Sequence, residues 1–135
     1  MTNVEVTGGA VPRLPRREIA AFVRRILKHL KRDVQEVSIA FVDDAAMTSL
    51  NRKFRRKNKT TDVLTFPGDG PFLGDIVISL DQARRQAADE KHSLATEVRY
   101  LILHGILHAL GHDHETDDGE MNALEVQVRP MVGLT

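Results

Sequence analysis

The sequence predicts an α/β fold with α+β character, in which four strands pack with about five helices. Two observations predict this class: short segments with apolar residues at every second position alternate with longer segments whose apolar residues recur every three or four positions. A third is the segment from Leu94 to Leu110, where apolar residues surround most of the helix circumference, so that this helix is expected to be buried at the centre. At 135 residues the chain is expected to form a single domain, residues 1–135.

Four segments have the alternation or the β-branched residues that strands favour, at residues 4–6, 37–41, 61–67 and 73–80. The last two are joined by a short connection rich in glycine and proline, so we expect them to pair antiparallel. Helices are predicted at residues 16–31, 44–54, 82–91, 94–110 and 120–132. Asp43 or Asp44 is expected to cap the second helix, Asp81 the third and Ser93 the fourth.

Composition limits the classes of protein to which the chain can belong. It contains no cysteine, which excludes disulfides and thiolate metal sites. Its first ten residues do not resemble a secretory leader, and no stretch approaches the 18 apolar residues of a membrane span. We therefore expect a cytoplasmic protein without a membrane partner.

The formal net charge of zero hides two oppositely charged halves. Residues 1–60 contain 14 Lys and Arg against 6 Asp and Glu, which gives +8, whereas residues 61–135 contain 5 against 13, which gives −8. Residues 51–59, called here the basic segment, hold six cationic side chains in nine positions. Such a segment is either an ordinary solvated surface or a surface that faces an anionic polymer.

Four of the six histidines lie between residues 104 and 114. His104 and His108 are four residues apart, so on a helix they share one face and can approach one metal ion. Gly111 is placed to end that helix in a left-handed conformation, after which His114 can return over the helix end. The spacing therefore predicts a three-histidine site with an open position, as in catalytic zinc sites, with one Zn²⁺ per chain.

Three alternatives stay open for these histidines. They could be packing or surface residues, or they could hold a structural zinc ion with His112 or Asp113 as a fourth donor, although structural zinc sites usually use cysteine. Three imidazoles also suit nickel or copper. His112 itself is expected to be a turn residue or to lie outside the ligand set.

The spacing H-x3-H-x5-H also occurs in zinc proteases, where a glutamate follows the first histidine and acts as the general base. That position is Gly105 here, so the protease base is missing. Metal-activated water can attack a phosphodiester without a separate carboxylate, provided that a cation stabilises the phosphate charge. The Arg and Lys residues at 52–59 could supply this cation, which favours a nucleic-acid phosphodiesterase over a peptidase.

Two motifs together resemble the bacterial YbeY endoribonuclease family. His104 to His114 reads H-G-x-L-H-x-L-G-x-D-H, and Leu50 to Pro67 combines L-N-x-x-F/Y-R with T-D-V-L-S/T-F-P. The likeness runs from about residue 36 onward. It implies an α/β fold with a mixed, mostly parallel four-stranded sheet. It also implies a metal-dependent endoribonuclease (a hydrolase) that cuts single-stranded RNA, acting in maturation of the 3′ end of small-subunit rRNA and in ribosome quality control.

The resemblance also assigns residues and partners. The zinc ligands of the family match His104, His108 and His114, and its essential cleft arginine matches Arg55. Expected partners are single-stranded RNA, rRNA, and the small ribosomal subunit with its proteins, but not DNA. A metallopeptidase or a non-catalytic, zinc-containing ribosome-assembly factor are the alternatives.

Two positions depart from the family pattern. His112 replaces a tyrosine, and Thr60 replaces a proline before the T-D-V-L run. The first leaves open whether His112 touches the metal, and the second is expected to loosen the loop that carries the basic segment.

Overall fold

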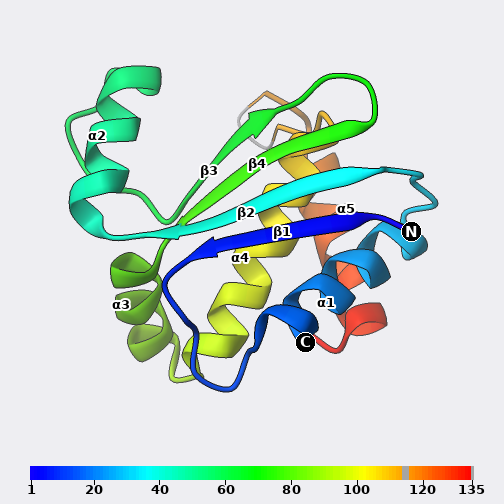
Figure 1. Cartoon of the computed structure of the whole chain (residues 1–135), viewed down its shortest axis with the longest axis horizontal. Coiled ribbons are helices and arrows are strands. Elements are labelled where there is room, and N and C mark those ends of the chain that lie inside the picture. The colour runs from blue at the N-terminus through cyan, green and yellow to red at the C-terminus, as the bar shows by residue number, and fades with distance from the viewer. Residues whose placement is uncertain (114–115, 135) are drawn as a thin grey trace.

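The computed structural model describes residues 1–113 and 116–134 (Figure 1). Their strands are β1 (Asn3–Gly8), β2 (Glu36–Val42), β3 (Val63–Pro67) and β4 (Phe72–Ser79). Their helices are α1 (Arg16–His29), α2 (Asp44–Arg55), α3 (Leu80–Glu90), α4 (Leu94–Ala109) and α5 (Glu120–Val128), followed by the 3-10 helix η1 (Arg129–Val132). The predicted α/β class with four strands and five α-helices is confirmed for the described residues.

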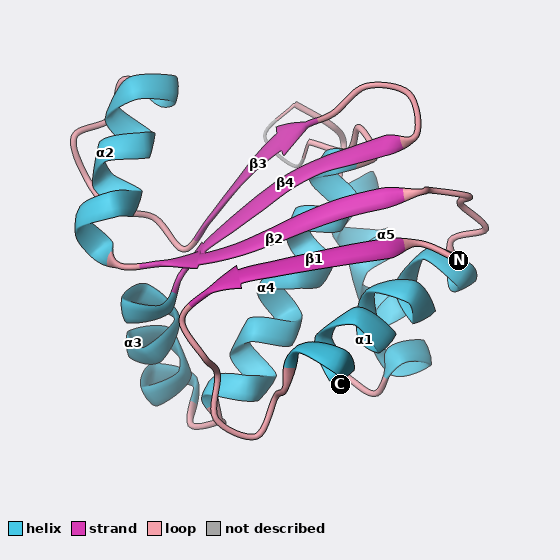
Figure 2. Cartoon of the chain, viewed as in Figure 1, coloured by secondary structure: helices cyan, strands magenta, loops and turns pink. Residues whose placement is uncertain are grey.

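The strands form one mixed sheet in the order β1-β2-β4-β3 (Figure 2). β1 pairs with β2 and β2 with β4 in parallel, as the register Val6↔Ile39 and Ile39↔Ile76 shows. β3 pairs antiparallel with β4 at one edge of the sheet, so the predicted antiparallel pair and the mostly parallel sheet are both confirmed. β3 therefore has one edge without a strand partner among the described residues.

Alternate residues of β4 separate the two faces of the sheet. Ile76 and Ile78 belong to the main core, which includes the buried residues of α1 and α4. Val77 belongs to a smaller cluster with Met47 of α2 and Leu64 of β3. The sheet thus separates α4 on one face from α2 on the other. No helix among the described residues combines the length and apolarity needed to cross a membrane.

The α4 helix is buried at the centre, as predicted. Nine of its residues are buried, and they include Val98, Ile102 and Ile106, which are completely inaccessible to solvent. Ser93 caps the helix, because its side chain accepts a hydrogen bond from the Thr96 N–H. A buried helix of this kind holds the side chains on its remaining face in fixed positions.

Two predicted helix ends are wrong. Asp81 does not cap α3, because the helix begins at Leu80 immediately after β4 and the Ser79 hydroxyl accepts from the Gln82 N–H. Asp81 instead accepts from the Asp44 N–H at 2.9 Å. The last predicted helix also stops at Val128 and continues as η1, since Pro130 has no N–H to extend the α-helical ladder.

α4 approaches β4 closely because residue 105 has no side chain. A Cβ atom at Gly105 would lie 2.6 Å from Cγ2 of Ile76, a fully buried and β-branched residue with little rotamer freedom. The Gly105 carbonyl also accepts from the Thr65 hydroxyl of β3 at 3.4 Å. Any side chain at position 105 would therefore push the helix away from the sheet.

We predict that Gly105→Ala lowers the free energy of unfolding by about 1 kcal/mol. Overpacking costs about 1–3 kcal/mol, whereas alanine in a helix returns up to about 1 kcal/mol relative to glycine. In an Ile76→Ala background the same substitution should be neutral or stabilising, because the clashing Cγ2 atom is gone. Urea unfolding of the four proteins measures both effects, and an equal effect of Gly105→Ala in the two backgrounds would contradict the close contact.

Candidate active site

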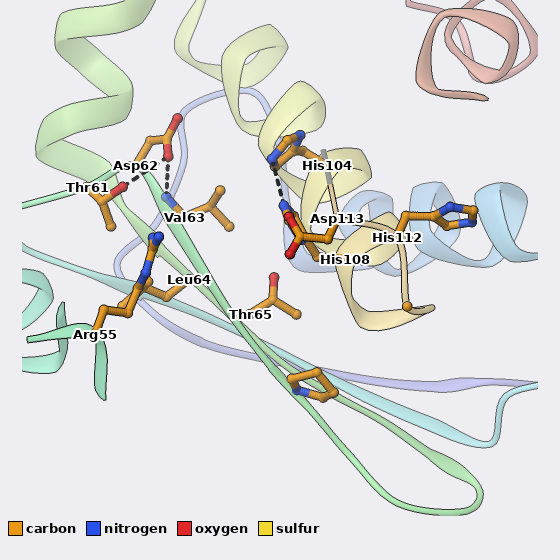
Figure 3. Close-up of a pocket in the computed structure, with 12 residues that line it drawn as sticks. Arg55, Thr61, Asp62, Val63, Leu64, Thr65, His104, His108, His112 and Asp113 are labelled. Atoms are coloured by element: carbon orange, nitrogen blue, oxygen red, sulfur yellow. Dashed lines mark hydrogen bonds between the residues drawn. The ribbon is translucent and has the colours of Figure 1, made fainter. Parts of the chain in front are cut away.

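A cleft of about 640 Å³ lies beside the edge strand β3. Three separate parts of the chain form its walls: the end of α2 at Arg55, residues 61–67 around β3, and residues 104–113 at the end of α4. In Figure 3 the Arg55 side chain points into the cleft from one side, and the His104 and His108 rings face it from the other. The structure thus brings together the predicted arginine and two of the three predicted histidines. His114 lies outside the described residues.

His104 and His108 project from the same face of α4, as their spacing predicts. Their Nε2 atoms are 3.2 Å apart. Two Zn–N bonds of about 2.0–2.1 Å in tetrahedral geometry would place the two nitrogens about 3.3 Å apart. The pair therefore fits two adjacent ligand positions of one zinc ion. Within residues 1–113 and 116–134, no three His, Cys, Asp or Glu side chains are grouped so as to hold a metal.

The turn after α4 has the geometry that the glycine predicts. Gly111 has a φ of 102°, in the region that favours glycine. Its N–H donates to the His108 carbonyl and the His112 N–H donates to the Leu107 carbonyl, the two hydrogen bonds of a Schellman motif. In Figure 3 the His112 ring points away from the His104 and His108 pair, which agrees with its interpretation as a turn residue.

Glu125 of α5 accepts a hydrogen bond from the His104 ring nitrogen that faces away from the cleft. The His104 Nδ1–H donates to Glu125 Oε1 at 3.0 Å, and because a carboxylate only accepts, this bond leaves the lone pair of His104 on Nε2, facing the cleft. Arg129 donates to the other carboxylate oxygen at 2.6 Å, and its guanidinium lies 5.1 Å from the Tyr100 ring centroid. Burial raises the pKa of Glu125, but the hydrogen bond from His104 and the charge and hydrogen bond of Arg129 outweigh this effect, so the pKa lies below its usual value.

The sequence reasoning did not find Glu125. The contact joins two residues that are 21 positions apart and lie on different helices, and α5 has no local pattern that marks one carboxylate for such a role. The apolar partners of a helix leave a periodic signal, whereas a single polar contact between two helices does not.

Hydrogen bonds between its two ends hold the basic segment in a defined conformation. The buried Asn51 side chain donates to the Lys59 carbonyl at 2.9 Å. Arg52 donates through two nitrogens to Asn58 Oδ1, at 2.9 and 2.6 Å. The six cationic side chains are therefore displayed on an organised turn, and among them only Arg55 lines the cleft.

Asp44 ties the end of this turn to the sheet. Its Oδ1 accepts from the hydroxyls of Thr60 at 3.0 Å and Ser79 at 3.1 Å, and from Arg85 at 2.9 Å. The Thr60 bond opposes the loosening that the sequence leads us to expect at this position. Burial raises the pKa of Asp44. The hydrogen bonds from Arg85, Thr60 and Ser79 and the charge of Arg85 lower it by more, so the pKa lies below its usual value.

Among the residues that the structure describes, no glutamate lines the cleft in the place of the protease base. A side chain at Gly105 would enter the sheet at Ile76 rather than the cleft. The buried Glu97, on the same helix, is held by His92 at 2.6 Å and Gln86 at 2.9 Å. The carboxylates that line the cleft in the described structure are Asp62 and Asp113, and Asp62 accepts from the Val63 N–H at 2.7 Å. These positions differ from the glutamate that follows the first histidine in the proteases.

Comparison with known proteins decides the family. The family model described as Endoribonuclease YbeY matches residues 10–132. The chain belongs to the YbeY family. A Solibacter usitatus protein named Endoribonuclease YbeY is 46% identical over 121 residues, which cover 90% of this chain and 82% of that protein. A Nautilia profundicola protein of the same name is 47% identical over 97 residues, which cover 70% of each chain.

A solved structure supports the fold of this YbeY-family chain. The solution structure of the Thermotoga maritima protein TM1509 matches it with a TM-score of 0.69 and 26% identity, covering 96% of this chain and 89% of that one. The family resemblance and the fold are thereby confirmed. The roles of Arg55, His104, His108 and His114 stay predictions.

We predict that Asp44→Asn destabilises this chain at pH 7 by on the order of 1 kcal/mol, discounted for its partial exposure. Because the folded state lowers the pKa of Asp44, its contribution to stability is fully present above the usual aspartate pKa of about 3.9. It is lost as the pH falls through the lowered value. The difference between wild type and variant in urea unfolding should therefore shrink at about pH 3.

The matched control is Asp69→Asn, an exposed aspartate in the connection between β3 and β4. It should change the free energy of unfolding by less than about 0.5 kcal/mol at either pH. If the loss of unfolding free energy in Asp44→Asn were as large at about pH 3 as at pH 7, the carboxylate charge would not be what anchors the turn.

Proposed function

We propose that this YbeY-family chain is a zinc-dependent endoribonuclease that hydrolyses single-stranded RNA in rRNA maturation and ribosome quality control. One observation carries the proposal: the cleft places a histidine pair on a rigid helix opposite Arg55 of the basic segment. The relatives named Endoribonuclease YbeY support the reaction and the RNA substrate. The small ribosomal subunit and its proteins are the proposed partners, and the cytoplasm the proposed location.

His104, His108 and His114 would hold one zinc ion per chain. The 3.2 Å separation of the Nε2 atoms of the first two supports this assignment, as does the Glu125 carboxylate that keeps the His104 lone pair directed at the cleft. When bound, zinc acts as a Lewis acid that lowers the pKa of water and so provides a nucleophile at neutral pH.

Arg55 would bind the phosphate that is cut. Its guanidinium is charged at all relevant pH values and can hold two phosphate oxygens at once. Negative charge accumulates on the non-bridging oxygens as water adds to phosphorus and the bond to the leaving ribose oxygen breaks. A fixed cation on the cleft wall opposite the histidines would stabilise this charge most in the transition state. The remaining cations of the basic segment would attract the RNA backbone without sequence preference.

We predict that Arg55→Ala lowers the cleavage rate of a labelled single-stranded rRNA fragment by about 10²–10³-fold, the usual effect of removing one transition-state donor. Its zinc content should stay near that of the wild type. His108→Ala should lose both cleavage and zinc. Arg17→Ala, which removes an exposed cation of α1 away from the cleft, serves as the matched control and should cleave normally.

Equal cleavage by all four proteins would point to a contaminating nuclease and reject the assigned residues. Loss of zinc in Arg55→Ala would show that the arginine maintains the fold of the site instead of binding phosphate. Absence of cleavage by zinc-loaded wild type, both with RNA alone and with small ribosomal subunits, would favour a role as an assembly factor.

We also predict that Glu125→Gln weakens zinc binding by about 10–100-fold, the usual effect of losing a partner behind a ligand. A neutral amide no longer fixes the Nδ1–H tautomer of His104, because its nitrogen can also face the ring. Competition with a chromophoric chelator measures the affinity independently of cleavage. Glu90→Gln, which alters an exposed carboxylate of α3, is the control, and unchanged affinity in Glu125→Gln would remove the positioning role.

A further inference from the structure

One aromatic side chain stands out by its exposure. The chain has five phenylalanines and one tyrosine, all within the described residues, and only the Phe54 ring is exposed, at 55%. Phe22 and Phe41 are each 4% exposed. Burying a phenylalanine is strongly favourable, so its exposure on α2 calls for a physical reason.

Neighbouring side chains hold the Phe54 ring without covering it. The Phe66 ring meets it edge to face, with ring centroids 5.0 Å apart and planes inclined by 71°. The Lys53 ammonium lies 5.3 Å from the centroid. Phe66 is itself packed against the small core under α2, so it provides a fixed support. Lys53 is an exposed and flexible side chain that can move aside when another group covers the ring.

Phe54 lies across the edge strand β3 from the cleft. Thr65 and Pro67 line the cleft, and Thr65 also contacts α4. Phe66, between them in the strand, faces the opposite side and contacts Phe54. Arg55, the residue after Phe54, enters the cleft (Figure 3). RNA with a phosphate at Arg55 would reach the exposed Phe54 ring by passing around the open edge of β3.

We propose that Phe54 is a stacking platform for one unpaired base of single-stranded RNA, next to the nucleotide whose phosphate Arg55 binds. The proposal rests on the proposed function and adds how the substrate is selected. Stacking on an aromatic ring accepts any base, because every base has a π face, and the surrounding cations bind the flanking phosphates. A base within a duplex already stacks on both faces, so the same ring disfavours double-stranded RNA.

The competing explanation is that Phe54 only covers the small core under α2. In that case a leucine of similar hydrophobicity would serve equally well, and the loss of the ring would not depend on the bases of the RNA. Phe54→Leu and Phe54→Trp separate the two explanations, since leucine retains apolar volume and tryptophan retains the stacking surface.

The experiment measures binding of an unstructured oligoadenylate to zinc-loaded protein, with the same oligonucleotide carrying abasic sites as a second probe. Phe54→Leu should weaken binding of the oligoadenylate by about 5- to 100-fold and bind the abasic probe as the wild type does. Phe54→Trp should retain the affinity. The natural chain contains no tryptophan, so the emission of this variant reports the position alone and should be quenched by saturating oligoadenylate.

Met131→Ala, which trims an exposed apolar side chain on η1, controls for a general loss of surface hydrophobicity and should bind normally. Normal affinity of Phe54→Leu, or unchanged emission of Phe54→Trp at saturation, would overturn the stacking platform. If the wild type binds and cleaves RNA in an Arg55-dependent manner while either result is obtained, only this inference fails. If the wild type neither binds nor cleaves RNA, the proposed function fails together with it.

Discussion

The close contact between α4 and β4 at Gly105 is the constraint on which the site depends. Glycine in a helix interior costs about 0.5–1 kcal/mol relative to alanine, yet here it allows the helix to lie against Ile76 without a gap. The buried face of α4 then leaves one strip exposed, and His104 and His108 occupy it. Because the helix cannot shift or rotate without disturbing the core, the two imidazoles keep their relative position when no metal is bound.

The cleft exists because helices on opposite faces of the sheet reach the same edge strand. α4 lies on one face of β3 and α2 on the other, and the last turn of α2 brings Arg55 around the open edge. The hydrogen bonds of Asp44 to Thr60 and Ser79 fix the start of α2 to the segment before β3 and to the end of β4. Phosphate binding and metal binding would thus come from separate elements that share one strand as a support.

Local sequence signals predict the histidine pair and the turn that follows it. The i, i+4 spacing of His104 and His108 and the left-handed Gly111 depend on neighbours in sequence, and the structure reproduces both. The Ser79 cap depends on where β4 ends and α3 begins, and the Glu125 contact depends on how α5 packs against α4. The periodicity of the sequence therefore predicts neither. The family resemblance identifies Arg55, because six cations in nine positions do not show from spacing alone which of them faces the cleft.

The cleft also lies where the two charge halves of the chain meet. Arg55 belongs to the basic half, whereas the histidines, Asp62 and Asp113 belong to the acidic half. The cleft carboxylates repel a phosphate that the basic segment attracts. A divalent cation bound at the histidines would offset the negative charge of these two carboxylates. Metal binding would therefore prepare the cleft to receive an anionic backbone before any chemistry begins, so that metal loading of the site and its affinity for RNA would be coupled through electrostatics.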